Sequence, residues 1–139
     1  MTASQDQLAR TQRRSHSQCV VCGDGRGLAL NFSVDADGTV RATFECQSAY
    51  QGYDGLLHGG VIALLLDGAM TNCLFAHGVA ALTAEMKVRY RHPVRIGQPV
   101  LILARIVQSS APLFLLESQL FQSGLQCARG TGKFMQVST

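Results

Sequence analysis

The sequence predicts an α+β fold in which a long antiparallel sheet wraps around one central, buried helix. Two observations carry this prediction. The stretch 59–77 is apolar on nearly every side, which is typical of a buried helix. Segments before and after it alternate between apolar and polar residues, as strands with one buried face do. The predicted order of elements is β-β-α-β-β-β-β.

The length of 139 residues fits one domain. Residues 1–18 are rich in Gln, Ser and Arg, which predicts a loose, flexible arm or a short peripheral helix ahead of a single domain at 19–139. Two strands are expected at 27–34 and 39–46. The Asp-Gly pair in the link 35–38 favours a hairpin between them, because both residues tolerate positive φ.

The helix is expected to follow a loop at 48–57, to begin at Gly59 and to stop at Gly78, since glycine is favoured just past a helix end. Four further strands are predicted at 82–91, 98–109, 112–122 and 125–137. In the first of these, strict alternation places five residues on one face: Thr83, Glu85, Lys87, Arg89 and Arg91.

Composition narrows the functional class. Apolar residues make up 47% and charged residues only 15%, so part of the surface is expected to meet another subunit. A net charge of +3 without tryptophan or a basic stripe argues against a nucleic-acid or membrane-surface protein. The longest apolar run is interrupted at 58–60 and ended by Asp67, so no transmembrane segment is expected. An odd cysteine count and the missing signal segment favour a cytoplasmic location.

Asp67 is the first candidate functional residue. It lies in the middle of the apolar helix, where aspartate is a poor helix former and a carboxylate is rarely buried without a partner. The start of the same helix, His58-Gly59-Gly60, is the second candidate. Two glycines let a ligand approach the backbone closely, and free N–H groups in the first turn suit an anion or a developing oxyanion.

These two candidates are too far apart to act together within one chain. Nine helical residues separate His58 from Asp67, about 13–14 Å, and place them on opposite sides of the helix. If they cooperate, Asp67 of one subunit must meet the Gly59 end of another subunit's helix. A two-fold homodimer with antiparallel helices satisfies this requirement twice.

The segments YQGYDGLLHGGVIALLLDGAM and LTAEMKVRYRHPVRIGQPV resemble the hotdog-fold acyl-CoA thioesterases, part of the 4-hydroxybenzoyl-CoA thioesterase superfamily. The resemblance is greatest to the phenylacetate-pathway type and the related THEM-like subgroup, and CVVCGDGRGLALNF looks like the opening of that group. It spans roughly residue 16 to the end. It implies a hotdog fold and hydrolysis of acyl-CoA to the free acid and coenzyme A.

The resemblance also implies catalytic roles for five residues. Asp67 matches the acid that activates water or attacks the thioester directly, and the Gly59 N–H matches the group that polarises the carbonyl. His58 flanks and supports that turn. Thr83 matches a hydroxyl that helps to orient the water, and Gln51 falls in a loop that approaches the thioester in related enzymes.

Substrate-binding roles follow in the same way. Gly60 allows close approach at the helix start, and Arg89 and Arg91 match positions that contact coenzyme A, where guanidinium groups suit phosphate recognition. Arg129 and Lys133 are further candidates of the same kind. A solvated strand face explains Arg89 and Arg91 equally well.

Neither a metal nor a cofactor is predicted. Cys19-x-x-Cys22 with His16 nearby is half of a structural zinc site, and no second pair follows, because the other three cysteines are scattered. Structural thiols are therefore the favoured interpretation.

The sequence thus predicts an acyl-CoA thioesterase that acts as a homodimer, paired into a homotetramer. A non-catalytic acyl-CoA binding or sensing module on the same fold remains the alternative. Gly68 favours this alternative, because it departs from the glutamate that often follows the acid in the family. A hotdog dehydratase is disfavoured, because Gly-Gly-Val follows His58.

Overall fold

A computed structural model describes residues 2–24 and 27–137 of the chain. Its elements follow the predicted order, with one additional helix at the start and a single 3-10 turn in the predicted loop. They are α1 (Gln5–His16), β1 (Ser33–Val34), β2 (Val40–Glu45), the 3-10 turn (Ser48–Tyr50), α2 (Gly59–Ala76), β3 (Ala81–Tyr90), β4 (Pro99–Ser110), β5 (Leu113–Gln122) and β6 (Leu125–Gln136).

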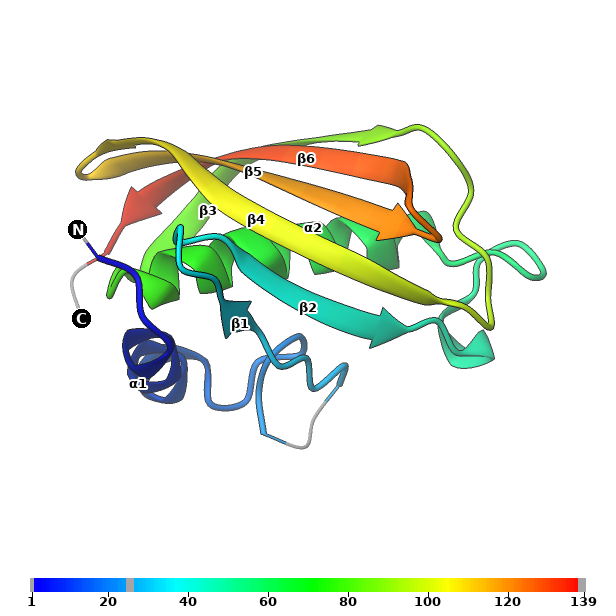
Figure 1. The fold of residues 1–139 in the computed structure, drawn as a ribbon, viewed down its shortest axis with the longest axis horizontal. Coiled ribbons are helices and arrows are strands. Elements are labelled where there is room, and N and C mark those ends of the chain that lie inside the picture. Colours follow the sequence, from blue (N-terminus) through cyan, green and yellow to red (C-terminus); the bar gives the residue numbers. More distant parts are fainter. Residues whose placement is uncertain (1, 25–26, 138–139) are drawn as a thin grey trace.

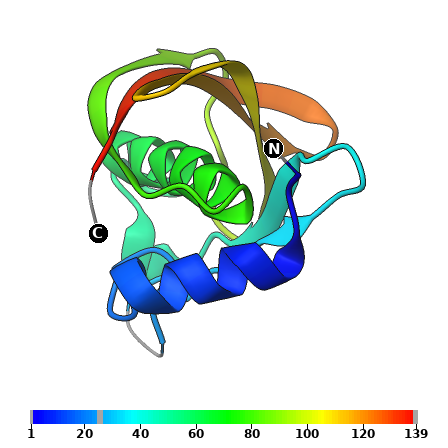
Figure 2. The same ribbon diagram turned by 90° about the vertical axis from the view of Figure 1, so that its left-hand side faces the viewer.

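The six strands form one antiparallel sheet in the order β1-β2-β4-β5-β6-β3. The sheet curves over α2, which lies along its inner face (Figures 1 and 2). Leu65, Leu66, Met70 and Leu74 of α2 are completely buried in the core between helix and sheet. The predicted arrangement, a sheet wrapped around one central helix, is confirmed.

Both ends of α2 follow local sequence signals. His58 caps the start, and its Nδ1 accepts a hydrogen bond of 2.8 Å from the N–H of Gly60. At the other end Gly78 has φ +75°, and the N–H groups of Gly78 and Val79 donate to Phe75 O and Leu74 O. These two hydrogen bonds form a Schellman motif, which requires the left-handed conformation that glycine adopts easily.

By length and mean hydropathy alone, α2 qualifies as a candidate membrane span. The sequence had predicted no such segment, because Asp67 ends the apolar run. However, 67% of its 18-residue window is buried inside the fold, which is the environment of a core helix. Its apolar character is therefore explained by the sheet that surrounds it.

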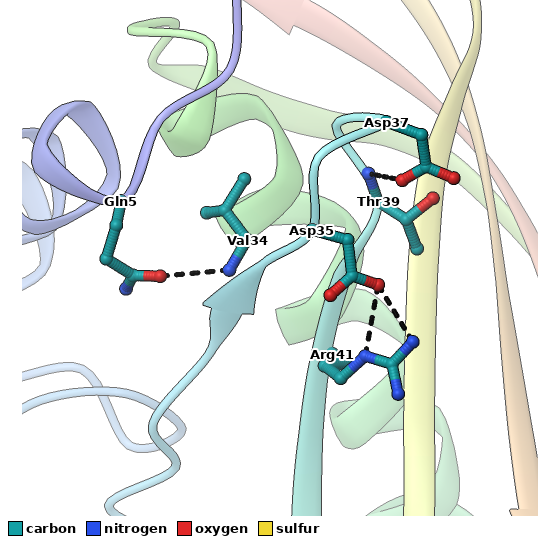
Figure 3. Close-up of polar contacts among 6 residues, drawn as sticks. All are labelled: Gln5, Val34, Asp35, Asp37, Thr39 and Arg41. Atoms are coloured by element: carbon teal, nitrogen blue, oxygen red, sulfur yellow. Dashed lines mark hydrogen bonds and ion pairs between the residues drawn. The ribbon is translucent and has the colours of Figure 1, made fainter.

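The predicted hairpin between β1 and β2 is present, with Gly38 at φ +88° in its turn. Its contacts appear in Figure 3. The Asp37 carboxylate accepts from the N–H of Thr39, and Asp35 pairs with Arg41 at 2.8 Å. The hydrogen bond from Thr39 lowers the pKa of Asp37.

The strand predicted at 27–34 is wrong for most of its length, because only Ser33 and Val34 belong to the sheet. The N–H groups of Leu28 and Leu30 donate to Val20 O and Val21 O, so this segment bonds to the preceding loop. Ala29 has φ +48°, which breaks an extended strand. The apolar residues that alternate with polar ones in this segment pack into the core, but their backbone does not form a strand.

At the start of the chain, the structure has a helix packed against α2. In α1, Ser4 caps the first turn, Leu8 and Thr11 are buried, and the Ser4 N–H donates to Ala76 O at the end of α2. The helix lies on the side of α2 opposite the sheet (Figure 2). The central helix is thus covered on both sides.

Candidate active site

Asp67 and Thr83 lie together, although 16 positions separate them in the chain. The hydroxyl of Thr83, on β3, donates a hydrogen bond of 2.7 Å to Oδ1 of Asp67, in the middle of α2. Asp67 is half-buried, and it is the only charged residue of α2. Hydrogen bonds to an ionised carboxylate are short and strong, so the contact fixes the carboxylate's orientation.

A β-bulge aims Thr83 at α2. Thr83 lies opposite Phe134 of β6, whereas Glu85 lies opposite Lys133, so Ala84 is an extra residue in β3. An extra residue shifts the alternation by one, which sends the residues before and after it to different faces of the sheet. Thr83 therefore faces the helix, as its bond to Asp67 requires.

Beyond the bulge the arginines face outward. Arg89 lies opposite Arg129 of β6, whose side chain is on the outer face of the sheet. The prediction that Thr83 and Arg89 share a strand face is therefore wrong, and Arg91 lies past the end of β3. The alternation of residue types along β3 could not reveal a bulge, in which two residues of one strand lie opposite one residue of its neighbour.

The start of α2 offers a free backbone donor. The N–H of Gly60 bonds to the His58 ring, whereas the N–H of Gly59 has no hydrogen-bond partner among the residues described. A Cβ at Gly60 would lie 3.0 Å from that ring, so the cap fits closely around glycine. Gly59, not Gly60, presents the donor.

Tyr90 is a residue that the sequence did not single out. Its hydroxyl donates 2.8 Å to the carbonyl of Gly59, which ties the end of β3 to the start of α2. A hollow of about 300 Å³ lies here, lined by Gly59, Tyr90 and Arg91 together with Tyr53 and His92. Of the three predicted substrate-binding arginines, Arg91 is the one that lines the hollow at the helix tip. No local signal in the sequence pointed to Tyr90.

Gln51 lies in the loop before α2, and its side chain is engaged locally. Oε1 of Gln51 accepts a hydrogen bond of 3.1 Å from the N–H of Gly55. The carbonyl of the preceding residue, Tyr50, accepts from the N–H of His58. Gln51 therefore stabilises the loop that leads into the helix start, and the structure does not bring it to Asp67.

Arg129 and Lys133 are held by acids on the outer face of the sheet. Arg129 pairs with Glu117 at 3.0 Å, and Lys133 pairs with Glu85 at 3.7 Å. They line an outer hollow of about 320 Å³ that does not include the helix tip. The structure therefore separates these two from Gly59 and Asp67.

Gly68, directly after Asp67, lets the Cys19–Cys22 turn approach α2. A Cβ at Gly68 would lie 2.6 Å from Cγ1 of Val21. A glutamate here would need the space that Val21 occupies. The departure from the family's frequent glutamate is thus matched by the packing of this turn on the helix.

The end of α1 and this turn place His16, Cys19 and Cys22 on the side of α2 near Asp67. Burial lowers the pKa of His16, and the Asp67 charge opposes this shift. Burial raises the pKa of Cys22 to about 11, while hydrogen bonding with Asn72 opposes it. All five cysteines are free thiols.

Residues 54–127 match the family model of the thioesterase superfamily, which is more than half of the 139 residues. The chain belongs to the thioesterase superfamily. The matched segment includes the helix start, Asp67, Thr83 and Arg91.

Individual relatives are consistent with this family. Acyl-coenzyme A thioesterase THEM4 of Bos taurus is 28% identical over 102 residues, covering 71% of this chain and 42% of the relative. The chain spans about half the length of the curated relatives that it matches.

Solved structures show the hotdog fold. The E. coli PaaI protein, from the phenylacetic acid degradation operon, has a TM-score of 0.82 at 13% identity, covering 96% of this chain and 95% of that one. The protein smu.793 of Streptococcus mutans, solved with acetyl CoA bound, has a TM-score of 0.74 at 21% identity. The match covers 79% of this chain and 90% of that one. The resemblance of this chain to thioesterases of the PaaI and THEM type is thereby confirmed.

Proposed function

We propose that this thioesterase-superfamily protein hydrolyses acyl-CoA thioesters to the free acid and coenzyme A. The observation that carries the proposal is the hydrogen bond between Thr83 and Asp67, which orients the single carboxylate of an apolar helix. The names of the relatives agree with this chemistry. A thioester is an activated acyl group, so a positioned base and one oxyanion donor suffice without a Ser-His-Asp set.

In the proposed reaction Asp67 removes a proton from water as the water attacks the carbonyl carbon. The Thr83 hydroxyl donates a hydrogen bond to Asp67. The lone pairs of the Thr83 oxygen therefore remain free to accept a hydrogen bond from that water. The developing oxyanion is stabilised by the free N–H of Gly59 at a helix N-terminus, where the helix dipole also favours negative charge. Collapse of the intermediate releases the coenzyme A thiolate.

The proposed site is shared between two subunits. Asp67 and Gly59 of one chain are eight helical residues apart, about 12 Å along α2, too far to hold the same carbonyl. β3 is an edge strand, exposed at Leu82 and Ala84, and an unpaired edge of ten residues is a template for pairing with a second chain. Pairing of two β3 edges about a two-fold axis sets the α2 helices antiparallel, with Asp67 opposite the partner's helix start.

Coenzyme A is proposed to bind near the helix tip through Arg91, which lines the hollow beside Gly59, with Arg89 on the outer face of β3 as a further phosphate contact. In the part of the chain that the structure describes, neither arginine forms an ion pair, whereas Arg129 and Lys133 do. An unpaired guanidinium retains its donors for phosphate oxygens. The further pairing of dimers into a tetramer rests on the family resemblance.

The test is release of coenzyme A from a panel of thioesters with short aliphatic, long aliphatic and aromatic acyl groups, followed by chromatography. The wild-type protein should turn over at least one. Asp67→Asn should lower turnover by roughly 10²–10⁴-fold while circular dichroism stays unchanged, because the amide cannot accept the proton. Asp37→Asn, on the β1–β2 turn, is the matched control and should keep full activity.

The outcome separates the alternatives. Full turnover by folded Asp67→Asn would overturn the role of Asp67. Binding of the acyl-CoA panel without any release by the wild-type protein would favour the acyl-CoA binding module instead. Transfer of ¹⁸O from labelled Asp67 to the product acid in a single turnover would show that Asp67 attacks directly rather than through water.

A further inference from the structure

His16, Cys19 and Cys22 form a cluster that the proposed hydrolysis does not use. His16 is the last residue of α1, and the two cysteines lie in the turn that follows it. Their ligand atoms all lie within 4.8 Å of one another. Nδ1 of His16 and Sγ of Cys22 are 3.8 Å apart.

These separations are close to those around a tetrahedral zinc ion. Zinc binds sulfur at about 2.3 Å and imidazole nitrogen at about 2.0–2.1 Å, so the ligand atoms of one ion lie roughly 3.5–3.8 Å apart. The His16–Cys22 separation already falls at this value, and the remaining separations need to close by at most about 1 Å. Two thiols and one imidazole are also the ligand types that favour zinc over hard cations.

The turn holds the Cys19 sulfur in place through its backbone. The N–H of Val21 donates to Sγ of Cys19 at 3.3 Å, and the N–H of Gly23 donates to Cys19 O at 2.8 Å. A Cβ at Gly23 would lie 2.4 Å from Cys19 N, so the turn closes only around glycine. Backbone donors to a cysteine sulfur stabilise the thiolate that a metal requires.

The surrounding residues position the ligands and leave one group unsatisfied. Nε2 of Gln12 donates to both His16 O and Cys22 O at 2.8 Å. Asn72 of α2 is 1% exposed, its amide N–H donates to Gly68 O at 2.9 Å, and its side chain opposes the rise in the pKa of Cys22. Oδ1 of Asn72 is buried without a partner among the described residues. A buried amide oxygen of this kind needs a donor.

We infer that His16, Cys19 and Cys22 bind one zinc ion, with a water molecule as the fourth ligand. Three protein ligands leave one tetrahedral position open, and a zinc-bound water supplies the donor that Asn72 Oδ1 lacks. The ion would fasten the turn to the end of α1, and its bound water would join both to Asn72 of α2, on the helix where Val21 packs on Gly68. This inference extends beyond the proposed hydrolysis and does not depend on it.

The structure also explains why the sequence prediction missed this site. A single Cys-x-x-Cys pair lacked a second pair, and His16, three residues before Cys19, was not counted as a third ligand beside it. The T-shaped contact between His16 and Phe75, with ring centroids 4.8 Å apart, anchors the imidazole there. The contact with α2 therefore holds the third ligand beside the cysteine pair.

The test is metal content of the reduced, full-length protein after reconstitution with zinc and removal of free ion, measured by mass spectrometry. One zinc per chain is expected. Reconstitution with Co²⁺ should give the thiolate-to-cobalt charge-transfer band and the intense visible bands of a tetrahedral site. Cys19→Ser and Cys22→Ser should lose both signals, whereas Cys127→Ser, a buried cysteine on β6, should keep them.

Two outcomes would overturn the inference. One is wild-type protein that has five titratable thiols but takes up neither zinc nor cobalt. The other is loss of the cobalt spectrum in Cys127→Ser to the same extent as in Cys22→Ser. The cobalt spectrum of the wild-type protein reports thiolate ligation directly. If a variant does not fold, the wild-type spectrum alone therefore decides whether the site binds metal.

Discussion

The Thr83 hydroxyl and the Asp67 carboxylate, on an edge strand and on the central helix, meet at 2.7 Å because the bulge at Ala84 turns Thr83 inward. Without the bulge, Thr83 would lie on the outer face with Arg89. The carboxylate is therefore oriented by an irregularity in a strand that also forms the exposed edge of the sheet.

This relationship makes Thr83→Val a sensitive substitution. Valine keeps the shape but removes the donor, and a hydrogen bond to a charged group contributes about 1.5–3 kcal/mol. We expect kcat for acyl-CoA hydrolysis to fall roughly 10–100-fold. Thr83→Ser keeps the hydroxyl and should retain most of the activity, measured as coenzyme A release. Equal activity of the valine and serine variants would contradict the orienting role.

The Gly59 N–H can be removed with little disturbance. Proline is favoured at the first helical position, and His58 already has the φ −61° and ψ 134° that a following proline requires. A Cβ at Gly59 meets its nearest atom, in the Tyr90 ring, at 3.6 Å, an ordinary contact. Gly59→Pro should therefore fold and should lose roughly 10²–10³-fold in kcat, as for other oxyanion donors.

Mixing Gly59→Pro with Asp67→Asn then tests whether the site is shared. After the chains exchange, half of the dimers carry one chain of each kind. In each mixed dimer one of the two shared sites keeps both Asp67 and Gly59, so activity should recover to about a quarter of wild type. If each site lies within one chain, the mixture should stay as inactive as either variant.

The effect of Gly68→Ala on the free energy of unfolding is expected to depend on the residue that packs against position 68. Alanine improves helix propensity by about 1 kcal/mol, but its Cβ would lie 2.6 Å from Cγ1 of Val21, and overpacking costs about 1–3 kcal/mol. Gly68→Ala should therefore destabilise the wild-type protein. In a Val21→Ala background it should be neutral or stabilising. Urea unfolding of the four proteins measures this, and an identical cost in both backgrounds would refute the contact.

Glu117 links stability to pH. Partial burial raises the pKa of Glu117, but hydrogen bonds and ion pairs with Arg129 and Arg105 outweigh it and hold the pKa below its usual value. A carboxyl whose pKa is depressed by folding stabilises the protein above its unfolded pKa of about 4.3, and this contribution disappears as the pH falls through the folded value.

Glu117→Gln should therefore lower the free energy of unfolding at pH 7, and the difference from wild type should shrink below about pH 4. Urea unfolding across this pH range measures the effect. Glu45→Gln on β2 is the control, because Glu45 forms no ion pair among the described residues. A difference between Glu117→Gln and wild type that does not vary with pH would contradict the ion-pair account.

The limits of α2 and the place of Asp67 as its single charge were already contained in the sequence. The His58 cap and Gly78 act within a few residues, so a local pattern is enough to predict where the helix begins and ends. Asp67 was conspicuous because it is the only charge in an apolar helix. The sheet's four long strands followed from alternation, which reports burial directly.

Other features depend on contacts between distant segments, so only the tertiary structure decided them. Alternation at 27–34 predicted a strand, but the backbone there bonds to the loop at Val20 and Val21. The bulge at Ala84 is a property of how β3 pairs with β6 and has no signature in β3 itself. Likewise, the ring contact of His16 with Phe75 exists only because α1 packs on α2. Local sequence thus determined the elements and their candidate residues, whereas packing between elements decided which of those residues meet.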